Sequence, residues 1–121
     1  MTIDDKFTAI FGSKCGHAGI LTRQAIKDKI VTAFPDTPEG SVIPSDYCYN
    51  MINVGISFSR TRVLFKDRVH LFEHTNPGER GDYKIIGKVS DYNGPIFWKG
   101  KQVGEWLNGV PSFFHDTSLF R

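Results

Sequence analysis

The feature that most constrains the fold of this chain is a change in its apolar periodicity. Before residue 35 the apolar residues recur at helical spacing, and from residue 56 onward they follow strand-like runs separated by turn residues. Helices in the first part of a chain and hairpins in the second are typical of the α+β class. Because 121 residues suit one domain with its own core, we expect residues 1–121 to form a single α+β domain.

Two segments of the first part show clear helical spacing. Residues 3–11 predict a short helix, and residues 22–34 predict a longer one with a single apolar stripe. Thr22 is placed to cap the N-terminus of the second helix, and Pro35 ends it.

Residues 45–54 predict a further helix with a polar face. Pro44 precedes it, Ser45 is a good N-cap, and Gly55 follows it as a natural C-terminal residue. An asparagine on such a face can make two hydrogen bonds to the edge of adenine in the major groove, and Ser45 and the Tyr49 hydroxyl are predicted to hold phosphates, which favours a recognition helix. The alternative is that Ser45 and Asp46 only cap the helix while the asparagines bond nearby backbone. The residues of this face are Asp46, Tyr49, Asn50 and Asn53.

The second part of the chain predicts a β-rich region over residues 56–107. One hairpin runs from Leu71 to Gly87 through a long polar tip, and another turns through residues 99–101. Residues 108–121 form a tail that either packs back or mediates association.

The order of helix, helix and hairpin is the layout of a winged helix-turn-helix protein. In this interpretation residues 22–34 form the supporting helix, residues 45–54 form the helix that recognises DNA, and residues 73–82 form the tip of the wing. A resemblance rests on the residues 43–50, Asn53, 71–73, 81–83 and 92–95. In these residues the sequence resembles a family of small, uncharacterised, bacterial, winged-helix-like domains that occur alone or beside restriction-type endonucleases. The resemblance covers residues 20–100 and implies a DNA-related context, with no catalytic residue carried over.

The stretch of residues 59–68 concentrates positive charge, with four cations and one acid. Cations that neutralise phosphates supply most of the affinity for nucleic acid. The alternative is the solvated face of a strand. Arg80 at the hairpin tip is a further candidate for a minor groove, although Glu79 beside it favours an ordinary loop. The four cations are Arg60, Arg62, Lys66 and Arg68.

Aromatic residues in the last third of the chain are either core or the lining of a ligand pocket, and burial is the commoner role of such residues. They are Tyr92, Phe97, Trp98 and Trp106. Cys15 and Cys48 are expected to be free thiols in a reducing compartment, because no secretion signal is visible. No zinc site is expected, because the paired spacing of zinc ligands is absent. Glu73, Asp82 and Lys84 are interpreted as cross-strand ion pairs, with a metal-dependent nuclease as the alternative, and no cofactor is expected.

Net charge is only +2, so charge distribution rather than total charge must support a nucleic-acid partner. No signal peptide or apolar span is visible, so we expect a soluble cytoplasmic protein with no membrane partner. The leading hypothesis is a DNA-binding module without enzyme activity, serving restriction, phage defence or regulation. The alternative is a protein-interaction module that uses its aromatic C-terminal third.

Overall fold

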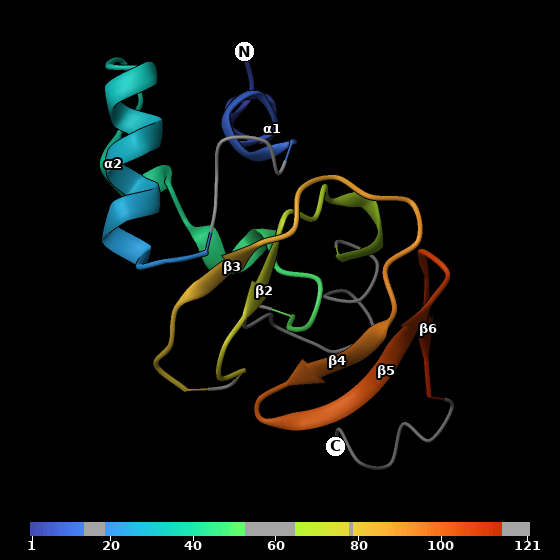
Figure 1. The fold of residues 1–121 in the computed structure, drawn as a ribbon. Coiled ribbons are helices and arrows are strands. Elements are labelled where there is room, and N and C mark those ends of the chain that lie inside the picture. The colour runs from blue at the N-terminus through green and yellow to red at the C-terminus, as the bar shows by residue number, and fades with distance from the viewer. Residues whose placement is uncertain (14–18, 53–64, 78, 115–121) are drawn as a thin grey trace.

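The computed structural model describes residues 1–13, 19–52, 65–77 and 79–114 of the chain. The first elements are helix α1 (Ile3–Phe11), strand β1 (Ile20–Leu21) and helix α2 (Arg23–Ala33). Two short 3-10 helices follow, η1 (Glu39–Ser41) and η2 (Pro44–Tyr47). The remaining elements in Figure 1 are the strands β2 (Phe72–His74), β3 (Tyr83–Ile85), β4 (Gly94–Trp98), β5 (Lys101–Leu107) and β6 (Val110–Phe113).

Both helices predicted for the first part of the chain are confirmed. At the start of α1, Thr2 Oγ1 accepts a hydrogen bond from Asp5 N at 3.1 Å and Asp5 Oδ2 accepts one from Thr2 N at 3.2 Å. This reciprocal pair is a capping box. At the start of α2, Thr22 Oγ1 accepts a hydrogen bond from Ala25 N at 3.1 Å, as its position in the sequence indicates.

The helix predicted for residues 45–54 is wrong. Of its described residues, 45–52, only those in η2 are helical, and residues after η2 pair with distant strands. The backbone N–H groups of Tyr49 and Ile52 donate to carbonyl groups of β2 and β4, at 2.7 and 2.8 Å. Helix propensity is a weak preference that such long-range partners override. The recognition helix of the winged-helix interpretation is therefore absent from the described part of this segment, residues 45–52.

The first predicted hairpin is confirmed as part of a three-stranded antiparallel sheet with the strand order β1-β3-β2. Strand β1 adds to the free side of β3, with Leu21 opposite Tyr83. This pairing carries the start of α2 to the edge of the sheet, because α2 begins only two residues after β1 ends.

The second sheet is an antiparallel meander of β4, β5 and β6. Two-residue turns join its strands, and the first of them confirms the predicted turn at residues 99–101. Lys99 and Gly100 have φ angles of 50° and 77°, and Asn108 and Gly109 have φ angles of 51° and 81°. Positive φ at both central residues is the type I′ geometry that matches the twist of a hairpin.

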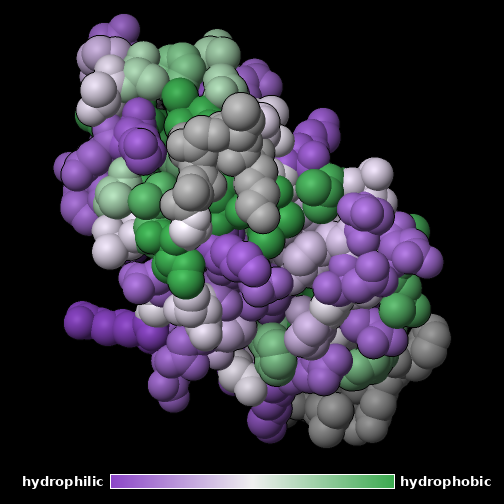
Figure 2. Space-filling model, viewed as in Figure 1, coloured by the Kyte–Doolittle hydropathy of each residue, from purple (hydrophilic) through white to green (hydrophobic). Residues whose placement is uncertain are grey.

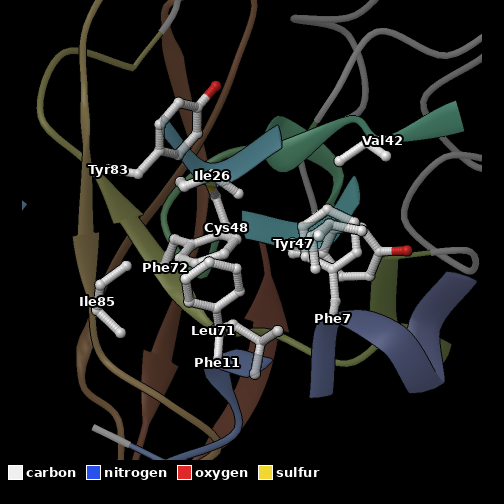
Figure 3. Packing of buried hydrophobic residues seen from close by; sticks show 11 residues of the cluster. Phe7, Phe11, Ile26, Val42, Tyr47, Cys48, Leu71, Phe72, Tyr83 and Ile85 are labelled. Atoms are coloured by element: carbon white, nitrogen blue, oxygen red, sulfur yellow. The ribbon is translucent and has the colours of Figure 1, made fainter. Parts of the chain in front are cut away.

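The described residues form two hydrophobic clusters. The first lies between the helices and the sheet β1-β3-β2, with Phe72 and Phe11 near its centre (Figure 3). The second lies against the sheet β4-β5-β6 and is rich in tyrosine and tryptophan. In Figure 2 hydrophobic surface gathers mainly in the upper half of the molecule, where α1 and α2 lie, and hydrophilic residues predominate below.

The α+β class is confirmed by this combination of helices and antiparallel sheets. A strand is the alternative predicted for the basic stretch, residues 59–68, of which the structure describes residues 65–68. Residues 65–67 are helical instead. Among the described residues, no helix has the length and apolar character needed to cross a membrane.

Candidate functional site

A polar groove lies where the N-terminus of α2 meets the β2–β3 hairpin. Its volume of about 650 Å³ is in the range of about 300–1,000 Å³ that is usual for ligand sites. Helix α2 and its cap contribute Thr22, Arg23 and Gln24, and the hairpin contributes His74 and residues 79–83. Figure 1 shows the N-terminal end of α2 beside β3.

The N-terminus of α2 gives one wall of the groove a partial positive charge. The first four N–H groups of a helix have no partner within the helix, and the aligned peptide dipoles concentrate positive potential there. Thr22 satisfies the N–H groups of Ala25 and Ile26 through its side chain and carbonyl group. Arg23, at the first helical position, adds a full positive charge and is exposed.

The loop between β2 and β3 forms the opposite wall, and its backbone is held by hydrogen bonds. Thr75 N donates to Asp82 O at 3.0 Å, and Asp82 N donates to Thr75 Oγ1 at 2.9 Å. Asn76 Nδ2 donates to Arg80 O at 3.3 Å. The backbone of Arg80 and Asp82 is thus positioned, while both side chains are exposed at the rim.

The floor of the groove consists of two buried side chains, His74 and Tyr83, which are 6% and 4% exposed. His74 Nδ1 accepts a hydrogen bond from Asn76 N at 3.0 Å, so the proton of the neutral imidazole is on Nε2. Burial lowers the pKa of His74 and raises the pKa of Tyr83 to about 12. Both groups are therefore neutral near pH 7. In Figure 3 the Tyr83 hydroxyl points away from the other labelled side chains.

The rim of the groove carries charges of both signs. Arg23 and Arg80 are positive, and neither forms an ion pair with another described residue. The Arg23 charge lies close enough to Tyr83 to counteract the rise in its pKa. Glu79 and Asp82 are the negative groups. A ligand that has both an anionic group and hydrogen-bond donors complements such a rim.

The structure corrects the roles predicted for Tyr49 and Asn50, which are 3% and 7% exposed. Asn50 Nδ2 donates to His74 O at 2.8 Å, and His74 N donates to Asn50 Oδ1 at 2.9 Å. Tyr49 donates its hydroxyl proton to Gly87 O and accepts from Val89 N. Reading base edges requires accessible polar groups, so that prediction is wrong for both residues. They hold neighbouring segments of the chain together instead.

The other predicted binding residues are dispersed. Arg68 Nη1 forms an ion pair with Asp46 Oδ2 at 2.8 Å, and the guanidinium lies over the ring of Tyr47 at 5.4 Å. Lys66 is exposed, and Ser45 is half-buried. Of the predicted binding residues that the structure describes, only Arg80 lines the groove. The residues Asn53, Arg60 and Arg62 lie outside the described residues.

The aromatic residues of the last third are mainly core. Tyr92 and Trp98 are both 8% exposed, Trp106 is 6% exposed, and all three belong to the second cluster. Phe97 is half-buried. Trp106 Nε1 donates to Tyr49 O at 2.7 Å, which satisfies both buried groups. The core interpretation of these residues is therefore confirmed, and the pocket interpretation does not apply to the three buried ones.

The residues considered for a nuclease divide between two environments. Glu73 lies opposite Lys84 on neighbouring strands, the geometry of a cross-strand pair. Its Oε2 also accepts a hydrogen bond from the Tyr92 hydroxyl at 2.6 Å. Asp82 is at the rim of the groove. No group of three or more metal-binding side chains is found among the residues that the structure describes.

Sequence reasoning did not identify Arg23, His74 and Tyr83 as parts of one site. One signal was available: an arginine in the first turn opposes the macrodipole, where acidic residues are favoured. The position of His74 and Tyr83 beside that helix follows from the pairing of β1 with β3, which local patterns do not specify.

These features define an α+β protein with two antiparallel sheets and a polar groove at a helix N-terminus. The chain belongs to the family described as Domain of unknown function (DUF7225), whose model matches residues 2–113. It is also 40% identical over 118 residues to a protein of Bacillus subtilis (strain 168) described as Uncharacterized protein YnaC. That match covers 93% of this chain and 39% of the relative, so the chain spans about two-fifths of the relative's length. No solved structure matches the chain.

These two matches confirm the expected resemblance to an uncharacterised family. The association with restriction-type endonucleases and the likeness to winged-helix proteins stay predictions.

Proposed function

We propose that this chain is a DNA-binding module that holds backbone phosphate at the polar groove. The observation that carries the proposal is that two exposed arginines, Arg23 and Arg80, both line the groove at the N-terminus of α2. Helix N-termini favour phosphate through their free N–H groups and dipole, and the planar fork of arginine suits phosphate oxygens. These two arginines have no ion-pair partner among the described residues, so binding would not have to break one.

This proposal moves the expected DNA contact from residues 45–54 to a different surface. Arg68 is already paired with Asp46, so it is less available to phosphate than the groove arginines are. Lys66 is exposed and remains a supplementary contact. The proposed setting is restriction, phage defence or regulation, in line with the DNA-related context that the sequence resemblance implies.

The test is fluorescence anisotropy with a labelled random-sequence duplex across a salt series. The wild-type chain is compared with Arg23→Gln and Arg80→Gln, and with Lys101→Gln as a control for loss of one charge at a residue that does not line the groove. Each arginine substitution is expected to weaken binding and to lower the salt slope by about one. The control is expected to bind as the wild type does.

Two results would overturn the proposal. The first is the absence of salt-dependent binding by the wild-type chain at low ionic strength. The second is an equal loss of affinity in Lys101→Gln, because this would show a diffuse charge effect and no role for the groove.

A specific observation also favours a second candidate, a protein-interaction module. Among the described residues after position 88, four large apolar side chains are exposed: Val89, Leu107, Val110 and Phe114 at 40%, 54%, 64% and 41%. Leu107 and Val110 are directly paired at the end of the β5–β6 hairpin. Such apolar residues grouped on one hairpin are a feature of interaction surfaces. Affinity capture from the native host with wild type and Val110→Asp tests this candidate, since a specific partner should be lost with the substitution.

A further inference from the structure

We propose that the groove binds a single unstacked nucleotide whose base carries an exocyclic amino group, an inference that rests on the proposed DNA-binding function. A groove for bare phosphate would have cations and donors only, whereas this rim also has two carboxylates. A nucleotide whose base has an amino group offers a partner both to the positive groups and to the negative groups of the rim. Its phosphate complements the guanidinium groups, and its amino group complements a carboxylate.

Asp82 is the group best placed to accept from the amino group. Its backbone N–H and C=O are both bonded to Thr75, which fixes its position in the loop. Its carboxylate has no hydrogen bond or ion pair with any other residue that the structure describes. Glu79, by comparison, already accepts from Asn76 Nδ2 at 3.4 Å. A carboxylate oxygen is a good acceptor for the N4 amino group of cytosine.

The floor of the groove has two hydrogen-bond donors that have no acceptor among the described residues. Tyr83 is 4% exposed, and no hydrogen bond of its hydroxyl to another described residue is present. His74 is 6% exposed, and with Nδ1 bonded to Asn76 its Nε2–H is the donor that remains. The carbonyl oxygen and ring nitrogen of cytosine are acceptors of the required kind.

The depth of the site explains why the nucleotide must be unstacked. Tyr83 and His74 lie at the floor, below an exposed rim formed by Arg23, Arg80 and Asp82. A base inside a duplex is stacked and paired, so it does not reach such a floor. Proteins that bind a base in a pocket take it from a single strand or rotate it out of the helix.

The experiment compares short single strands of deoxycytidine and deoxyuridine by fluorescence anisotropy. The two bases have the same size, and uracil has a carbonyl group where cytosine has the amino group. The wild-type chain is expected to prefer deoxycytidine by about five- to tenfold, the usual effect of one good base contact. Asp82→Asn should reduce this preference to less than about twofold, because a neutral amide is a weaker acceptor than a carboxylate.

Matched variants separate the base contact from phosphate binding. Arg23→Gln is expected to weaken binding to both strands equally, and Asp91→Asn, an exposed carboxylate away from the groove, is expected to change neither. A duplex with one unpaired cytosine should bind better than the fully paired duplex if rotation out of the helix is also accepted. Far-ultraviolet circular dichroism checks that each variant is folded.

Equal affinity of the wild-type chain for the two strands, with salt dependence and the Arg23 effect intact, would overturn this inference and leave the DNA-binding proposal standing. The same holds if Asp91→Asn abolishes the preference as Asp82→Asn does. Absence of binding to every strand would overturn the function and the inference together.

Discussion

The two hydrophobic clusters of this protein use aromatic side chains in different ways. In the first cluster, phenyl rings and aliphatic groups pack around Phe72, and two tyrosines direct their hydroxyl groups outward (Figure 3). Tyr47 donates to Asp4 on α1 at 2.6 Å, and Tyr83 lies at the floor of the groove. The stability of this cluster therefore depends mainly on apolar burial, and the Tyr83 hydroxyl stays available to a ligand.

The second cluster places polar atoms in its interior. Trp106 donates to the Tyr49 carbonyl, and the Tyr49 ring stacks on Tyr92 with centroids 4.2 Å apart. His70 lies among the rings of Phe65, Tyr49 and Trp106, and its buried Nε2 has no hydrogen-bond partner among the described residues. Stability here depends on hydrogen-bond geometry and protonation as well as on burial. The difference indicates that the first cluster carries the ligand-facing groups and the second is sensitive to pH and to polar substitutions.

The largest effect is expected from Phe72→Ala in the first cluster. Phe72 is fully buried and touches Phe7, Phe11 and Tyr83 through its ring. Removing the ring leaves a cavity, so the free energy of unfolding should fall by about 3–5 kcal/mol in urea titrations. Phe114→Ala, at a residue 41% exposed, is the control and should cost less than about 1 kcal/mol. Equal losses in the two variants would contradict the packing described here.

Acid should destabilise the second cluster through His70. Burial lowers the pKa of His70 from 6.5 to about 4, so the unfolded chain takes up a proton that the folded protein excludes. The folded state should lose up to about 3 kcal/mol as the pH falls from about 6.5 to about 4, with no such change above pH 7.

The measurement is the free energy of unfolding across this pH range. Burial also lowers the pKa of His74, which contributes with the same sign. The slope should become shallower in His70→Phe, and an unchanged slope would exclude His70 as its main source.

Asn50→Ala is expected to cost about 2–3 kcal/mol. The change leaves the buried N–H and C=O groups of His74 without their partners, and each unsatisfied group costs about 1–3 kcal/mol. Asn93→Ala, which removes an exposed hydrogen bond to Asn108 N, is the control and should stay within about 1 kcal/mol. Thermal denaturation of both variants measures the difference. If Asn50 were instead a surface reader of DNA, the two variants would be equally stable.

The smallest of these effects is expected from Trp106→Phe. An aromatic ring remains in the second cluster, but the hydrogen bond to the Tyr49 carbonyl is lost. The cost should be about 1–2 kcal/mol, from one buried acceptor without a donor. Urea unfolding measures it, and no loss of stability would show that the second cluster depends on burial alone, as the first does.

Local features of the sequence determined the helices and the tight turns. Thr22 caps α2 because its hydroxyl bonds an N–H group only three residues away. Lys99-Gly100 forms a hairpin turn because glycine adopts positive φ without strain, and the flanking runs favour strands. The α+β class follows from such short-range interactions, because they depend only on residues that are close together in the sequence.

Only the tertiary structure decided the path of residues 45–54 and the composition of the groove. Tyr49 and Ile52 bond to strands that lie more than twenty residues away, and these bonds override a sequence pattern that indicates a helix. Arg23, His74 and Tyr83 meet because β1 pairs with β3, a register set by long-range packing. Neither helix periodicity nor charge clustering encodes such pairings, because both describe neighbours along the chain, whereas the groove joins residues that are neighbours only in space.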